Sequence, residues 1–193
     1  MSTPSTRLTK AARREQLLEQ ALAIVRTRGA DGLTLVTLAE AAGVSRPIVY
    51  DHFGTRAGLL LALYRDLDER HRLALEAALR DAPGTVGATA ALISASYFAC
   101  AIDIPEFAAL SAALKGNPDL EATQHALLTA YTTTMATALT PYSALNAEAL
   151  HLRCTGLLGA AEALAAELAH GRASAPDAIA ALTDLITGDL TTR

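Results

Sequence analysis

Apolar side chains recur every three or four positions along most of the chain, which is the spacing that lines one face of an α-helix. In residues 10–28 this stripe contains Leu18, Leu22 and Val25, and Gly29 marks its end. Glycine and proline stand mainly between such stretches, where they end or start helices. The pattern therefore predicts a succession of helices separated by short turns.

Alanine and leucine dominate the composition and both favour helix, whereas runs of β-branched residues are rare. We therefore expect an all-α fold of about nine helices. The predicted ranges are 10–28, 35–41, 46–52, 56–80, 85–102, 105–115, 118–139, 146–170 and 176–190. We expect two domains, 1–56 and 57–193, which are linked by the long helix 56–80 and hinged near Pro83-Gly84.

Charge is distributed unevenly along the chain. The net charge is −4, which by itself argues against a nucleic-acid partner. Residues 1–56, however, carry eight lysines and arginines against five acids, while residues 57–193 carry eight against fifteen. A basic N-terminal part is either a solvated tail or the electrostatic footprint of nucleic-acid binding.

Residues 34–56, TLVTLAEAAGVSRPIVYDHFGTR, predict two short helices joined by a turn. Thr34 and Ser45 are suitable N-caps for them. Pro47 fits the first turn of the second helix, where its missing N–H costs little. Gly43 can adopt the positive φ that the turn requires.

The same segment supplies the packing that such a pair of helices needs. Ala39 is small enough to allow the second helix to cross the first. Five apolar residues have the spacing to anchor the pair on a third helix: Leu35, Leu38, Val44, Val49 and Phe53. The residues then left exposed on the second helix are Arg46, Pro47, Ile48, Tyr50, Asp51 and His52. Such a mixture of hydrogen-bonding and apolar groups is expected of a helix that lies in a major groove.

Over about residues 10–65 the sequence resembles the DNA-binding domain of the TetR family. The matching positions are Thr34, Ala39, Gly43-Val44-Ser45, Tyr50-Asp51-His52-Phe53 and Arg56. The family more often has lysine where Arg56 stands, and often has glycine where Arg46-Pro47 stand. The resemblance implies an N-terminal three-helix helix-turn-helix domain followed by a helical ligand-binding and dimerisation domain. The function it implies is that of a repressor that a small-molecule effector releases from a palindromic operator.

The resemblance also implies roles for individual residues. The expected phosphate contacts are Thr34, Thr37, Ser45, Tyr50, His52 and Arg56. Arg46 is expected to read guanine, and Pro47 and Ile48 to touch thymine methyl groups. Arg7 and Lys10 are expected to follow the DNA backbone or to enter a minor groove. Tyr50 could instead be a core-edge residue, and Asp51 could cap a helix or pair locally.

The helices 146–170 and 176–190 are expected to form the homodimer interface that the resemblance implies. Gly156, Gly159 and Ala163 lie on a flat face that permits close approach of another helix, and Leu182 and Leu185 belong to the last apolar stripe. The alternative is that both helices are only core within one chain. A two-fold dimer also suits the function, because two helices about 34–36 Å apart read successive major-groove faces of a palindrome.

An effector pocket is expected among helices 85–102, 105–115, 118–139 and 146–170. The candidate lining residues are Tyr97, Phe98, Cys100, Phe107, Tyr131, Met135 and Cys154, with Asp103, His125 and His151 as possible polar handles. Each of these could instead be plain core or surface. The apolar lining favours a hydrophobic or aromatic effector.

Other functions lack a supporting pattern. The sequence contains no common catalytic motif and no metal-ligand spacing, so we expect no enzyme activity, no metal and no cofactor. Cys100 and Cys154 are expected to be free thiols of a cytoplasmic protein without a membrane partner. A DNA-binding regulator without ligand control, or one that activates, remains an alternative. A helical enzyme and an interaction module that does not bind DNA are the more distant ones.

Overall fold

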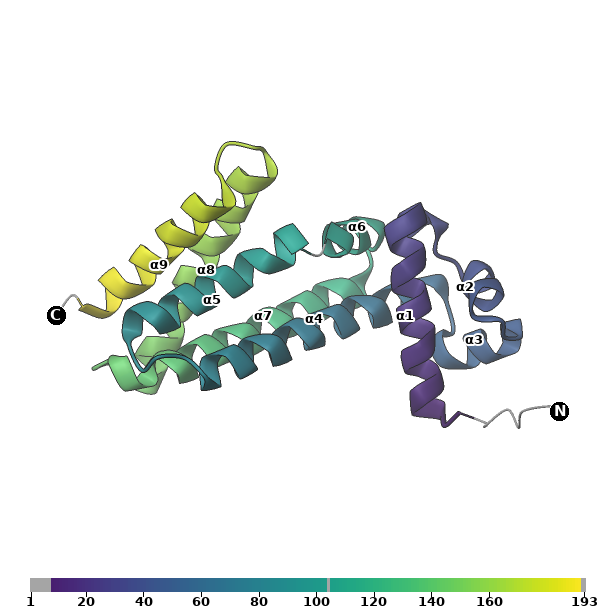
Figure 1. Cartoon of the computed structure of the whole chain (residues 1–193), viewed down its shortest axis with the longest axis horizontal. Helices are drawn as coiled ribbons and strands as arrows, with labels where there is room; N and C mark the ends of the chain where they lie inside the picture. Colours follow the sequence, from purple (N-terminus) through teal and green to yellow (C-terminus); the bar gives the residue numbers. More distant parts are fainter. Residues whose placement is uncertain (1–7, 104, 192–193) are drawn as a thin grey trace. The chain divides into compact units, whose positions relative to one another are not determined.

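The computed structural model describes residues 8–103 and 105–191, leaving aside the side chains of residues 100–105, 108 and 189–191. Within these residues the chain forms nine α-helices joined by short turns, and no strand is present (Figure 1). The all-α prediction is therefore confirmed. None of the described helices combines the length and the apolar character needed to span a membrane.

The observed helices agree with the predicted ranges to within two residues at each end. They are α1 (Lys10–Arg28), α2 (Leu35–Ala42), α3 (Arg46–Phe53), α4 (Arg56–Arg80), α5 (Val86–Asp103), α6 (Pro105–Ala113), α7 (Pro118–Leu139), α8 (Ala147–Ala169) and α9 (Ala175–Thr191). Two 3-10 turns, η1 (Ala30–Gly32) and η2 (Thr140–Tyr142), lie between helices. The agreement follows from strong local signals, because most predicted boundaries coincide with a capping residue, a glycine or a proline.

The helices form two compact units that are not consecutive blocks of sequence. One unit contains the chain up to Leu67 together with Glu106–Leu120, and the other contains Asp68–Pro105 together with the chain from Glu121 onward. Helix α6 thus belongs to the first unit, although α5 belongs to the second. The proposed functional boundary between residues 56 and 57 stays a prediction.

The core of the first unit consists of leucines and of the anchors predicted for the two short helices. Leu35, Leu38, Val49 and Phe53 are buried, and Val44 is half-buried. Buried leucines of α1 and of the first turns of α4, among them Leu17 and Leu60, belong to the same unit. Full burial of one such side chain stabilises the fold by about 1.5–3 kcal/mol, so these residues dominate the stability of the unit.

Two further contacts explain why α6 belongs to the first unit. The Arg26 Nε–H of α1 donates a hydrogen bond of 2.7 Å to Oε1 of Glu106, whose side chain is buried. The ring of Phe107 packs edge-on against Tyr64 of α4, with the ring centroids 5.0 Å apart. Both contacts join residues that are distant in sequence, which is why the periodic pattern did not indicate them.

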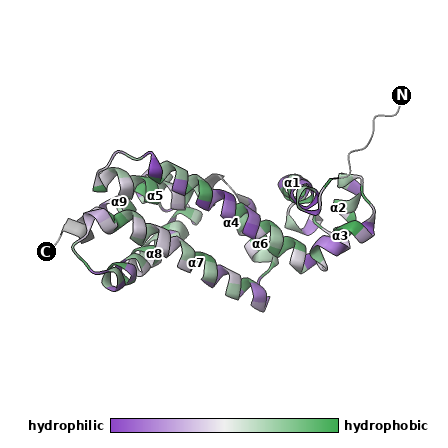
Figure 2. Cartoon of the chain, turned by 90° about the horizontal axis from the view of Figure 1, so that it is seen from below, coloured by the Kyte–Doolittle hydropathy of each residue, from purple (hydrophilic) through white to green (hydrophobic). Residues whose placement is uncertain are grey.

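The core of the second unit is an apolar cluster that α5, α7, α8 and α9 share. Its buried members are Ala90, Ile93, Phe98, Met135, Leu139, Leu150, Cys154, Ala161, Ala178, Leu182 and Ile186. Figure 2 shows the hydrophobic colour prevailing along α5, whereas hydrophilic stretches stand out on α1 and α4. A helix that is apolar over much of its circumference needs neighbours on several sides, and α5 packs against both α8 and α9.

A histidine side chain of α4, His71, is half-buried in this second unit. The Nε2 atom of His71 on α4 lies 3.0 Å from the Ser96 hydroxyl of α5. Burial lowers the pKa of His71 below the ordinary value of histidine, and a hydrogen bond with the Ser96 backbone offsets part of that effect. His71 is therefore neutral in the folded protein at neutral pH.

This lowered pKa predicts an acid-sensitive fold. Below about pH 6.5 the unfolded chain binds a proton at His71 that the folded chain still excludes, so the free energy of unfolding decreases as the pH falls. Urea unfolding between pH 7.5 and 5.5 measures this slope, and His71→Gln should flatten it. His151→Gln, at an exposed position of α8, is the control and should leave the slope as it is. Equal slopes for His71→Gln and the wild type would contradict the prediction.

Candidate nucleic-acid interface

Helix α2 begins with two threonines that cap it reciprocally. The Thr34 hydroxyl accepts a hydrogen bond of 3.0 Å from the Thr37 backbone N–H, and the Thr37 hydroxyl accepts one of 2.9 Å from the Thr34 N–H. The Thr37 hydroxyl also donates to the Gly32 carbonyl at 2.9 Å. The predicted N-cap is thus confirmed. Because both hydroxyls already bind backbone groups, any contact that they make with phosphate has to share these bonds.

The turn between α2 and α3 depends on Gly43. Its φ of 63° and ψ of 33° place it in the left-handed region, as the sequence predicted. A Cβ atom at this position would meet nothing within 4 Å, so the need for glycine comes from the backbone alone. For other residues that conformation costs about 1–2 kcal/mol. The next N–H, of Val44, closes α2 by donating to the Ala39 carbonyl at 3.0 Å.

Helix α3 has one buried side and one exposed side. Val49 and Phe53 are 0% and 8% exposed and face the core. The residues on the other side are all exposed: Arg46, Pro47, Ile48, Tyr50 and Asp51. His52 is half-buried. The predicted exposed face is confirmed except for the partial burial of His52, and Tyr50 is 50% exposed rather than part of the core edge.

Helix α3 begins without the hydrogen bond that an N-cap side chain usually accepts from the first turn. Ser45 occupies the N-cap position, as predicted, but its hydroxyl makes no capping hydrogen bond. Pro47 lies in the first turn and has no N–H to satisfy. An exposed hydroxyl at the start of a helix suits an anionic partner such as phosphate.

The charged side chains around α3 are paired with each other. Lys10 Nζ lies 3.0 Å from Oδ2 of Asp51, and Arg46 Nη2 lies 3.8 Å from Oε1 of Glu40. The hydrogen bond from Lys10 and its charge lower the pKa of Asp51. The pKa of His52 is lowered by burial and by the positive charge of Lys10, so its imidazole is neutral at neutral pH.

The corner between α3 and α4 is tightly built. A Cβ atom on Gly58 would clash with the carbonyl oxygen of Phe53, so only glycine lets α4 begin this close to the end of α3. The Thr55 hydroxyl accepts a 3.0 Å hydrogen bond from the Gly58 N–H. The guanidinium of Arg14 stacks over the Phe53 ring at 5.5 Å from its centroid. These contacts hold the end of α3 close to the start of α4 and to Arg14 of α1.

Arg56, predicted to contact phosphate, makes a different set of bonds in this structure. Its guanidinium donates to the carbonyl oxygens of Ala30 at 2.8 Å and Leu33 at 2.9 Å, and it lies 3.4 Å from Oδ1 of Asp31. The first residue of α4 is thereby attached to the loop that precedes α2. Sequence reasoning missed this attachment, since no periodic signal links residues 23 to 26 positions apart. A phosphate contact by Arg56 remains untested.

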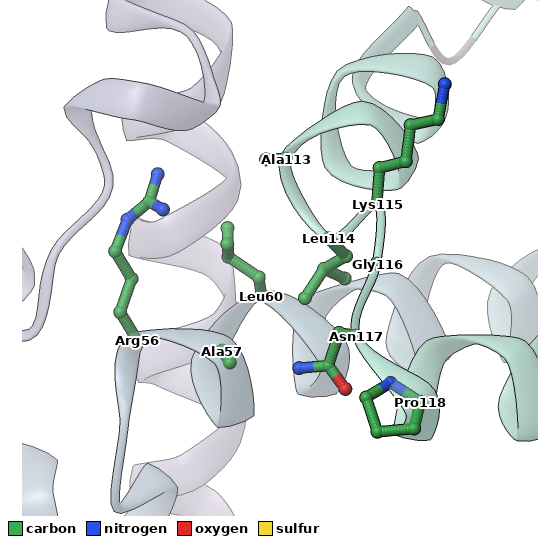
Figure 3. A pocket seen from close by; sticks show the side chains of 9 residues that line it. All are labelled: Arg56, Ala57, Leu60, Ala113, Leu114, Lys115, Gly116, Asn117 and Pro118. Atoms are coloured by element: carbon green, nitrogen blue, oxygen red, sulfur yellow. The ribbon is translucent and has the colours of Figure 1, made fainter.

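A pocket of about 360 Å³ lies in the first unit near the start of α4 (Figure 3). Leu60, Ala57 and Leu114 supply apolar wall, and the turn from Lys115 to Pro118 closes one side. Figure 3 shows the Arg56 side chain extending away from that turn, in keeping with its bonds to the loop before α2. This pocket is distinct from the predicted effector site, with which it shares no lining residue.

Most of the predicted effector-site residues come together in the core of the second unit. Phe98, Met135 and Cys154 are buried in the apolar cluster, and Tyr97 and Tyr131 pack against it. The Tyr131 hydroxyl donates to the Ile93 carbonyl at 3.0 Å.

The other candidates for that site lie elsewhere. Phe107 belongs to the first unit, beside Tyr64. His125 and His151 are exposed. The side chains of Cys100 and Asp103, like Arg7, lie outside the described residues.

Similarity to known proteins agrees with this geometry. Residues 17–63 match the model of the bacterial regulatory proteins of the tetR family, and this segment contains α2, α3 and the start of α4. No curated protein has a sequence that matches the chain.

Several solved structures share the fold over nearly the whole chain. A TetR-family transcriptional regulator from Pectobacterium atrosepticum is 24% identical, with a TM-score of 0.71 over 97% of this chain and 98% of that one. The fatty acid degradation regulator FadR from Bacillus halodurans is 15% identical, with a TM-score of 0.70 over 98% and 100%. The multidrug binding protein EbrR, complexed with imidazole, is 18% identical, with a TM-score of 0.66 over 96% of each chain. At these identities the likeness demonstrates the fold.

The bonds of Arg56 predict a loss of stability when they are removed. Hydrogen bonds to a charged group contribute about 1.5–3 kcal/mol, so Arg56→Ala should lower the free energy of unfolding by roughly that amount. Arg80→Ala, at the other end of α4 and exposed, is the matched control and should change it little. Denaturant unfolding of both variants measures the difference. If Arg56→Ala proved as stable as Arg80→Ala, the hydrogen bonds of Arg56 to Ala30 and Leu33 would not contribute to the free energy of unfolding.

Proposed function

Because residues 17–63 match the model of the bacterial regulatory proteins of the tetR family, we propose that the chain is a transcriptional regulator of that family, a homodimeric repressor that a small-molecule effector releases from a palindromic operator. The observation that carries the proposal is the geometry of α3. Val49 and Phe53 anchor one side of this helix, while Arg46, Pro47 and Ile48 stand exposed at its start. A short helix held in this way can enter a major groove with its N-terminal residues against the base edges.

The contacts with DNA divide into two kinds. Arg46 donates two hydrogen bonds to O6 and N7 of guanine, and Pro47 and Ile48 touch thymine methyl groups. These three residues read the sequence. The residues that determine position by contacting phosphate are Thr34, Thr37, Ser45, Tyr50, His52 and Arg56. Among them, Ser45 and Tyr50 are best supported, because both are exposed and the Ser45 hydroxyl makes no capping bond.

Helices α8 and α9 are proposed to form the dimer interface. Leu152 on α8 is 72% exposed and Leu185 on α9 is 47% exposed, which is unusual for leucine on the last two helices of one unit. Gly156 and Gly159 are also exposed on α8, and nothing lies within 4 Å of the Cβ that each lacks. A face of small residues with exposed leucines suits close packing against the same face of a second copy.

The effector is proposed to be a hydrophobic or aromatic small molecule bound in the second unit. Support comes from the aromatic and sulfur-containing side chains that gather there, with the Tyr97 ring 5.3 Å from Phe98 and 5.8 Å from Tyr131, between centroids. Met135 is an adaptable neighbour that can move to accommodate a ligand.

Release from DNA is proposed to proceed through α4. Residues of this helix belong to both units, and Arg56 at its start holds the loop before α2. An effector that favours a shifted α4 would therefore move the support of the helix-turn-helix. A coupling free energy of about 1–3 kcal/mol would lower the operator affinity roughly 5- to 150-fold.

The proposed base contact of Arg46 predicts a change at one operator position. Selection of bound duplexes from a random pool should yield a palindrome, and Arg46→Ala should relax the preference for one guanine per half-site by about 1–3 kcal/mol. Arg80→Ala is the control for loss of a positive charge and should select the same palindrome. Equal losses of affinity for every duplex in Arg46→Ala would show that Arg46 does not read bases. A wild-type protein that selects no sequence would refute the proposed function.

The proposed interface predicts that a charge at Leu152 separates the dimer. Leu152→Glu should make the protein sediment as a monomer. Its operator affinity should fall by about 10²–10⁴-fold, because the two half-sites are no longer bound by linked subunits. Leu73→Glu, on α4 and 51% exposed, changes a comparable leucine outside the interface and should remain dimeric. Sedimentation velocity and operator titration of both variants test the proposal, which a dimeric Leu152→Glu would contradict.

A further inference from the structure

A carboxylate stands among the groups that we assign to DNA. Asp51 lies three residues after Ile48 and four after Pro47, so it shares their side of α3. Its side chain is 67% exposed and pairs with Lys10, which is 72% exposed. Phosphates repel a carboxylate, so an acidic residue at this point lowers the affinity for DNA in general.

Asp51 does little for the stability of the protein. It lies near the C-terminal end of α3, where the helix dipole disfavours a negative charge. An exposed ion pair such as the one with Lys10 contributes little to stability and is easily exchanged for another partner. Neither capping nor packing therefore accounts for aspartate here. A contact with DNA accounts both for the exposure of Asp51 and for its place on the same side of α3 as Pro47 and Ile48.

Resting on the proposed DNA binding, we propose that Asp51 is a specificity-determining residue that exchanges Lys10 for the N4 amino group of a cytosine. Off DNA, the carboxylate is neutralised by Lys10. On the operator, Lys10 moves to a backbone phosphate and the carboxylate accepts a hydrogen bond from the cytosine edge in the major groove. Guanine and thymine present acceptors or a methyl group, which leave the carboxylate unpaired, and the amino group of adenine lies beside the N7 acceptor, which repels the carboxylate, so those duplexes bind more weakly.

The ion pair of Asp51 with Lys10 explains how one surface can both attract DNA and discriminate between base sequences. Lys10 supplies a phosphate contact on any duplex, but its release leaves a bare carboxylate unless a cytosine is present. The lowered pKa of Asp51 means that this carboxylate is charged at neutral pH, and hence an acceptor only. Arg46, which pairs with Glu40 at the longer distance of 3.8 Å, is held less closely.

Selection from a random duplex pool with the wild type and with Asp51→Asn tests this inference. The wild-type half-site should contain a cytosine that Asp51→Asn no longer selects, with the other positions unchanged. Replacing that C·G pair by T·A should weaken wild-type binding about 5- to 150-fold and leave Asp51→Asn nearly unaffected. Glu19→Gln, an exposed acid of α1 in the same unit, removes the same charge and should keep the wild-type half-site.

Lys10→Gln tests the other half of the exchange. It should weaken binding to every duplex, keep the selected half-site, and reduce the slope of log K against log salt by about 0.9 for each phosphate that the lysine no longer neutralises. Circular dichroism melts of each variant check that the fold is intact. The inference is overturned if Asp51→Asn selects the same half-site as the wild type, or if the position that changes is not cytosine. In either case a wild-type palindrome would leave the proposed function standing.

Discussion

The guanidinium of Arg56 joins the first turn of α4 to the carbonyl oxygens of Ala30 and Leu33, in the loop before α2. Helices α2 and α3 are the chain between these two points, so this side chain closes a loop of about two dozen residues. Inside the loop, the left-handed Gly43 turns the chain from α2 into α3, and the missing side chain of Gly58 lets α4 start against the end of α3. The position of α3 therefore depends on a few backbone conditions and one charged side chain.

The two sides of α3 differ in their surroundings, because one is buried and the other is exposed. Burial of Val49 and Phe53 stabilises the packing of α3 on the core, and the residues on the opposite side of the helix are not needed for that packing. The exposed side is consequently free to carry groups chosen for a partner. The charged side chains there are already paired, Lys10 with Asp51 and Arg46 with Glu40, so the proposed binding to DNA would exchange ionic partners rather than use free cations. Such an exchange lowers affinity for every duplex and so favours discrimination between sequences.

The two units are connected by the chain at more than one point. Helix α6 belongs with α1 and α4 because a buried carboxylate, Glu106, meets Arg26 and because Phe107 meets Tyr64. Residues of α4 also belong to both units. The chain passes between the two units at three points, within α4, at the start of α6 and within α7.

The sequence by itself determined the helices, their ends and the exposed side of α3. These features follow from local rules: apolar spacing, the Thr34 cap, the prolines, and a glycine at position 43 where the backbone needs positive φ. Only the tertiary structure decided what the long polar side chains do. The bonds of Arg56 to the loop before α2, the Lys10–Asp51 pair and the place of Glu106 join residues 23 to 80 positions apart. No periodic pattern encodes such partners, because an arginine or a lysine can reach any acceptor that the packing of the helices happens to bring within a few ångströms.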